Sequence, residues 1–113
     1  MKRLELQGGL RLGSLMIHTV FFWLKDGLSD EQVTLFESEL AKLPQIETVA
    51  SGKIGKPAPT ETRPVTDNSF SYHLSLTFDS IADHDAYQVH ADHDAFIDSC
   101  KDLWARVVVY DSE

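Results

Sequence analysis

The sequence has a single cysteine, few basic residues and no long apolar run, and each shortage excludes a class of protein. With Cys100 alone, one chain forms neither an internal disulfide nor a zinc site built from several thiolates. The 10 Lys and Arg residues against 18 Asp and Glu give a net charge of -8. Because phosphate backbones and anionic membranes attract basic surfaces, we expect neither nucleic acid nor membrane as a partner. No stretch approaches the roughly 20 apolar residues of a membrane span.

Sequence motifs for nucleophilic or phosphate chemistry are also missing. The chain contains neither Gly-x-Ser-x-Gly nor a Gly-rich phosphate loop, so hydrolase and nucleotide-dependent functions have no support. The first fifteen residues are interrupted by glycines and lack the apolar segment of a signal peptide. We therefore expect a cytoplasmic protein. Its 113 residues suit one domain with one core.

The domain is expected to begin at Met16. Residues 1–15 match neither the helical nor the strand period, which predicts an N-terminal extension, with the domain over residues 16–113. Residues 16–24 predict a strand whose two alternating faces are both apolar. Such a strand is covered on both sides. In a chain this short helices can cover one face, so the other face predicts a second copy of the chain and hence a homodimer.

The remaining elements complete an α+β pattern. Ser29 and Gln32 give the capping-box signature of a helix that Pro44 ends. Strands are expected over 46–54, 70–78 and 104–110, and the second helix is expected in two pieces, one capped by Ser80 and one starting near Asp92. The order βαββαβ predicts a ferredoxin-like fold, with a four-stranded antiparallel sheet and helices on one face. The proline-containing loop 56–69 is either a lid over a pocket or a simple crossing.

Four segments together resemble one known family. They are the opening Ile-His18-x-Val-Phe-Phe, the strand Tyr72-x-Leu-x-Leu-x-Phe78, the run Tyr87-x-x-His90-x-x-His93 with Phe96, and the closing Val107-Val-Val-Tyr-Asp111. In this order the chain resembles the stress-responsive dimeric α/β barrel (Dabb) family over residues 16–111. The resemblance implies a homodimer in which two sheets close into one barrel. This chain departs from the family in having Ala91 where proline is frequent and His73 where aspartate is frequent.

The resemblance also suggests where a ligand would bind. If His18 faces the helices that carry Tyr87 and His93, a mostly apolar pocket lies between the sheet and the helices of each protomer. The pocket would hold a small apolar or aromatic ligand. Residues expected to contact that ligand are His18, Val20, Phe22, Tyr72, Leu74, His90 and Phe96.

Three functions stay open at this point. The first is a dimeric protein that binds a small ligand in each protomer. The second follows from family members that resemble polyketide cyclases, whose residues matching Tyr87 and His93 act as an acid/base pair. That reading, or a monooxygenase-like one, would make the chain a cofactor-independent enzyme, because an imidazole can abstract a proton beside a carbonyl and a phenol can donate to the enolate oxygen. The third is a structural dimer with a filled core, since the fold alone does not specify a function.

A metal site is an alternative to these functions. His90 and His93 are three residues apart and have acidic neighbours. However, the predicted helix break near Ala91 spoils the shared face that two such ligands need. We expect no metal and no cofactor, and interpret the acidic residues as a solvated surface.

Overall fold

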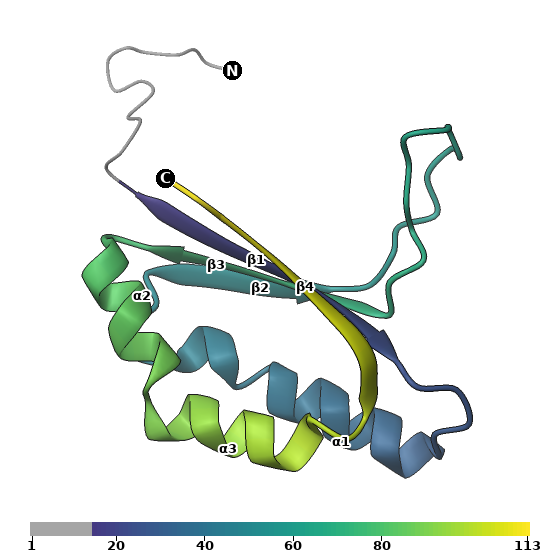
Figure 1. Cartoon of the computed structure of the whole chain (residues 1–113), viewed down its shortest axis with the longest axis horizontal. Coiled ribbons are helices and arrows are strands. Elements are labelled where there is room, and N and C mark those ends of the chain that lie inside the picture. Colours follow the sequence, from purple (N-terminus) through teal and green to yellow (C-terminus); the bar gives the residue numbers. More distant parts are fainter. Residues whose placement is uncertain (1–14) are drawn as a thin grey trace.

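In the computed structural model, which describes residues 15–113, a four-stranded antiparallel sheet carries all three α-helices on one face (Figure 1). The strand order is β2-β3-β1-β4. The elements are β1 (Met16–Leu24), α1 (Asp30–Leu40), the 3-10 turn η1 (Leu43–Gln45), β2 (Ser51–Gly55), β3 (Tyr72–Phe78), α2 (Ile81–Gln88), α3 (Ala91–Cys100) and β4 (Trp104–Ser112). The predicted ferredoxin-like βαββαβ fold is confirmed. The predicted N-terminal extension lies outside the described residues, apart from Leu15.

Strand β1 runs through the centre of the sheet, between β3 and β4, and its alternation sorts its side chains between two environments. Met16, His18, Val20 and Phe22 are buried toward the helices, and the residues between them lie on the outward face. The neighbouring strands follow the same alternation, because Val20 is paired with Leu74 on β3 and with Val109 on β4. The helix-facing side therefore holds the core, as the period of two predicts.

The helices begin where their capping residues predict. The Ser29 hydroxyl accepts a hydrogen bond from the Gln32 N–H at 3.1 Å, and the Gln32 side chain accepts from the Ser29 N–H at 2.8 Å. Ser80 caps α2 by accepting from the Asp83 N–H at 3.1 Å. The second helical region is divided, as expected, and its second part starts at Ala91. Helix α1 ends at Leu40, earlier than predicted, because Pro44 belongs to the separate turn η1.

Strand β2 is shorter than predicted, and its glycines have a different role. It starts at Ser51, since residues 46–50 form a turn. Gly52 and Gly55 are paired with Leu76 and His73 in the regular ladder, so neither marks a bulge. A Cβ at Gly52 would lie 2.6 Å from Leu76 Cδ2 and 3.1 Å from the Cβ of Pro44. Glycine at this position thus allows η1 to approach the sheet.

The core lies between the sheet and the helices. Its fully buried large side chains are Phe36, Leu40, Leu43, Leu74, Leu76, Phe78 and Tyr87, with Cys100 among them. Burial raises the pKa of the Cys100 thiol to about 11, so the thiol stays protonated and packs as a small apolar group. Among residues 15–113, no helix has the length and apolar character required to cross a membrane.

The outward face of the sheet is rich in apolar and aromatic groups. The Phe21 ring lies 5.0 Å from that of Phe70 and 6.3 Å from that of Tyr110. Ile17 is 41% exposed and Tyr110 is 65% exposed. The segment between β2 and β3 projects on this side, away from the helices (Figure 1). It therefore does not cover the space between sheet and helices.

Candidate functional site

A cavity of about 190 Å³ lies between the sheet and helices α2 and α3. Its walls are mostly apolar, and His18, Tyr87, Gln88 and His93 supply the polar groups. The apolar part of the lining comprises Val20, Phe22, Leu43, Leu74, Phe96, Ile97, Trp104, Val107 and Val109. An apolar cavity with a few convergent polar groups is the usual form of a small-molecule site.

Three separate elements bring the polar groups together. His18 comes from β1, Tyr87 from the last turn of α2, and His93 from the first turn of α3. The Tyr87 and His93 rings meet edge to face with centroids 4.9 Å apart, and the His18 ring lies 5.9 Å from Tyr87. The chain turns at Val89 and His90, between the two helices. This break lets residues six apart in sequence face the same cavity.

The imidazole of His93 is held in its neutral form. Burial lowers the pKa of His93, the nearby His18 and His84 lower it further, and Asp94 partly opposes the shift. Its Nδ1 is buried and has no hydrogen-bond partner among the described residues. A neutral imidazole with an unpaired ring nitrogen can accept a proton from a bound molecule.

The phenol of Tyr87 is held in its protonated form. Its side chain is 1% exposed, and burial raises the pKa of the hydroxyl above its ordinary range. The hydroxyl therefore keeps its proton at physiological pH and can donate a hydrogen bond to an oxygen of a ligand.

His18 connects the polar groups of the cavity to further polar side chains near the end of the sheet. It lies opposite Asp111 in the pairing of β1 with β4, and its Nδ1 is 2.6 Å from Asp111 Oδ1. The His84 ring, one turn before Tyr87 on α2, lies 5.0 Å from the His18 ring. Neither Asp111 nor His84 is among the site residues predicted from the sequence. The available signals were the i, i+3 spacing of His84 and Tyr87 and the antiparallel pairing of the two terminal strands.

Seven of the nine residues predicted for the site line the cavity, and Tyr72 and His90 do not. The Tyr72 hydroxyl donates to Glu37 at 2.7 Å, on the α1 side of the domain, and burial together with this contact raises its pKa to about 12. His90 is the N-cap of α3, accepts from the Asp92 N–H at 3.0 Å, and contacts Glu47 at 3.2 Å. His90 and His93 thus belong to different surroundings.

Comparison with known proteins agrees with this fold. No curated protein matches the chain. A Dabb family protein with a ferredoxin-like fold from Mesorhizobium loti is 23% identical, with a TM-score of 0.70 over 88% of this chain and 95% of the other. A dimeric ferredoxin-like protein of unknown function from Thermobifida fusca is 22% identical, with a TM-score of 0.68 over 91% of this chain and 94% of the other.

A third similar structure is an enzyme, the hydroxynitrile lyase from Passiflora edulis. It is 22% identical, with a TM-score of 0.69 over 87% of this chain and 91% of the other. At these identities the three structures establish a shared fold only. The family model described as the stress responsive A/B barrel domain matches residues 16–113. The chain therefore belongs to the stress responsive A/B barrel (Dabb) domain family.

Proposed function

We propose that the protein is a homodimer in which each protomer binds one small, largely apolar molecule in the cavity beside Tyr87 and His93. The observation that carries this proposal is the cavity itself, in which four polar side chains, His18, Tyr87, Gln88 and His93, stand in an otherwise apolar lining. Val107 and Val109 line it from the edge strand β4 and are 36% and 48% exposed. A ligand can therefore enter at the β4 edge.

The volume limits the size of the ligand. Drug-sized molecules occupy pockets of about 300–1,000 Å³, and an engineered apolar cavity of about 150 Å³ binds benzene. The 190 Å³ cavity of this protein suits a molecule with one ring or a short branched chain. Small aromatic aldehydes, ketones and phenols fit both the volume and the polar groups, and an extended polyketide chain exceeds the volume.

The outward face of the sheet supports the homodimer. Phe21 and Phe70 lie on this face, and Trp23 stacks under the Arg106 guanidinium at 4.3 Å. Adjacent apolar side chains of this kind are typical of an interface between copies. The related protein from Thermobifida fusca is described as dimeric. We infer that two copies pack their sheets face to face, which closes the barrel. The cytoplasmic location stays a prediction.

Acid/base catalysis in the same cavity is the second candidate function. The neutral His93 ring with its unpaired Nδ1 lies beside a protonated Tyr87. In this mechanism His93 takes a proton from the carbon next to a carbonyl group, the electron pair moves onto the carbonyl oxygen, and Tyr87 donates a hydrogen bond to that oxygen. The Passiflora edulis relative is named as a lyase, so a similar fold hosts an enzyme.

Two measurements on one ligand panel separate these functions. Protein NMR with small phenols, aldehydes and ketones should show saturable shifts for residues of the cavity. Substituting Tyr87→Phe should lower the affinity for oxygen-containing ligands and leave the affinity for benzene unchanged. If no member of the panel binds at millimolar concentration, the ligand-binding proposal is wrong.

Catalysis has its own test on any ketone that binds. Its α-hydrogens should exchange with deuterium faster with the protein than in buffer, and both His93→Gln and Tyr87→Phe should remove the acceleration. The matched control is His90→Gln, which alters a histidine outside the cavity. Binding with exchange at the buffer rate would exclude the acid/base function and retain the binding function.

A further inference from the structure

We propose that His18, His84 and Asp111 bind a transition-metal dication of the zinc class, at the end of the sheet where β4 faces α2. The ligand atoms of these three side chains lie within 4.8 Å of one another. Two histidines and a carboxylate form a nitrogen-rich set that prefers Zn²⁺, Co²⁺ or Ni²⁺ over Mg²⁺ and Ca²⁺. From the sequence no metal is expected, because a helix break separates His90 from His93 and no sequence pattern joins residues 18, 84 and 111.

The main observation is how the two ring nitrogens of His84 are paired. Its Nδ1 lies 3.0 Å from Asp85 Oδ1, and a carboxylate only accepts, so Nδ1 carries the proton. The lone pair is then on Nε2, which is buried and has no hydrogen-bond partner among the described residues. A histidine whose other nitrogen donates to a carboxylate is the usual arrangement of a metal ligand. His84 is therefore prepared to bind a cation through Nε2.

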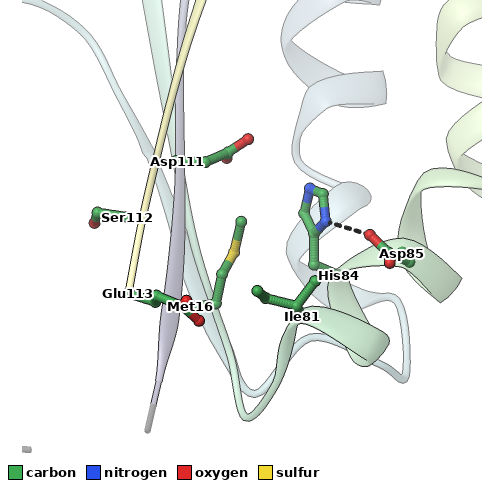
Figure 2. A pocket seen from close by; sticks show the side chains of 7 residues that line it. All are labelled: Met16, Ile81, His84, Asp85, Asp111, Ser112 and Glu113. Atoms are coloured by element: carbon green, nitrogen blue, oxygen red, sulfur yellow. Dashed lines mark hydrogen bonds and ion pairs between the residues drawn. The ribbon is translucent and has the colours of Figure 1, made fainter. Parts of the chain in front are cut away.

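The other two ligands face His84 from the sheet. His18 is buried, and Asp111 is directly opposite it in register, with 2.6 Å between Nδ1 and Oδ1. The Asp111 side chain is 44% exposed. Figure 2 shows Asp111 on the sheet and His84 on α2 at opposite walls of the same cavity, with the His84–Asp85 contact on the side of the ring that faces away from Asp111. A dication would be partly neutralised by Asp111, in a chain of net charge -8.

Binding requires side-chain movement and also breaks the 2.6 Å contact between His18 Nδ1 and Asp111 Oδ1. Zinc bonds of about 2.0–2.1 Å in a tetrahedral site place ligand atoms roughly 3.3 Å apart. Bringing atoms that lie within 4.8 Å to that separation takes small rotations of Asp111 and the two rings. The cavity beside them has a volume of about 310 Å³ and is also lined by Met16, Ile81 and Ser112. A fourth ligand, such as water, has room there.

The site is distinct from the ligand cavity, with His18 as the shared residue. His84 and Asp111 do not line the inner cavity. Variants at these two positions can therefore test the metal without removing a group of the proposed small-molecule site.

Calorimetry with Zn²⁺ tests the proposal on the full chain, without a histidine tag and stripped of metal by a chelator. We expect one Zn²⁺ per protomer, the same stoichiometry with Co²⁺ accompanied by visible absorption of a low-symmetry site, and no binding of Mg²⁺. His84→Leu and Asp111→Asn should each lower the Zn²⁺ affinity at least a hundredfold. Asp85→Ala, which removes the partner of Nδ1, should lower it about 10–100-fold.

The control is His90→Gln, which removes a histidine that contacts Glu47 elsewhere on the surface and should bind Zn²⁺ as the unchanged chain does. Thermal unfolding gives a second readout, since Zn²⁺ should raise the Tm of the unchanged chain but not of Asp111→Asn. If His84→Leu fails to fold, Asp111→Asn and Asp85→Ala decide, because their side chains are 44% and 70% exposed. Absence of saturable Zn²⁺ binding, or equal binding by these variants and the unchanged chain, would overturn the proposal.

Discussion

Val107 and Val108 are consecutive residues of β4 that lie on opposite faces of the sheet. Val107 lines the cavity beside Tyr87 and His93, whereas Val108 lies with Phe21 and Tyr110 on the outward face. Their partners on β1 are Phe22 and Phe21, respectively. The proposed ligand site and the proposed dimer interface are thus one residue apart, and the same substitution at the two positions should have different effects.

Val107→Asp should impair ligand binding and leave the dimer intact. The change places a carboxylate in an apolar cavity, and desolvating it opposes binding of an apolar ligand. We expect the affinity for a bound phenol or ketone to fall at least tenfold, measured by NMR titration. Sedimentation of the same variant should match that of the unchanged chain. Unchanged ligand affinity would mean that the ligand binds elsewhere.

Val108→Asp should separate the two copies and leave the cavity intact. Two symmetry-related carboxylates would be desolvated between the two sheets, which is costly in an interface core. We expect the dissociation constant of the dimer to rise at least a hundredfold in sedimentation equilibrium. Leu35→Asp is the control, because Leu35 is 41% exposed on α1, on the helical side. A chain that is monomeric before any substitution would contradict the homodimer.

His93 should make the protein less stable as the pH falls below neutrality. Its folded pKa lies below the ordinary 6.5, so in the window between the two values the unfolded chain binds more protons than the folded chain. The free energy of unfolding should therefore decrease from about pH 6.5 down to the folded pKa and level off below it. Urea unfolding at several pH values should show this dependence.

His93→Gln should reduce that dependence without abolishing it. Burial also lowers the pKa of His73, with help from Lys53, and this second group acts in the same direction. An imidazole titration followed by NMR, with the His93 signal identified by its loss in the variant, measures the pKa directly. A value at or above 6.5 would contradict the neutral base that the acid/base function requires.

Gly52→Ala should destabilise the fold, and Gly55→Ala should not. A Cβ at Gly52 meets Leu76 Cδ2 at 2.6 Å and the Ser75 carbonyl at 3.2 Å, whereas at Gly55 its nearest neighbour is His73 Nδ1 at 3.7 Å. Overpacking of this kind costs about 1–3 kcal/mol. Urea unfolding at one fixed protein concentration should show the loss for Gly52→Ala alone. Equal stability of the two variants would mean that Leu76 and the neighbouring turn η1 shift without cost.

The fold could be predicted because its local signals agree with one another. The alternation in β1 predicts the two faces of the sheet, and Ser29 and Ser80 predict where two helices start. The predicted ends of some elements were wrong. The strand predicted over residues 46–54 includes residues 46–50, which form a turn in the structure. From this turn the apolar Ile46 and Val49 pack against the core. Apolar residues bury equally well from turns, so hydrophobic pattern alone does not locate a strand end.

The site could be predicted only where one element determined a residue's direction. Val20, Phe22 and Leu74 follow from strand alternation. Tyr72 lies on the predicted face of β3, but at the α1 end, where its hydroxyl donates a hydrogen bond to Glu37. Strand alternation does not predict which helix covers which part of the sheet. His84 was missed for the same reason, since its approach to His18 depends on how α2 packs against β1.

Within residues 15–113, β4 pairs only with β1, so its other edge is free in this part of the protomer. Its run of residues 107–110, Val-Val-Val-Tyr, is β-branched and aromatic, the composition that joins strands of separate molecules into aggregates. Charged residues stand at both ends of that run, Arg106 before it and Asp111 after it. Flanking charges of this kind disfavour edge-to-edge association. Asp111 therefore occupies a position at which neutralisation, whether by substitution or by a bound cation, also removes a barrier to aggregation.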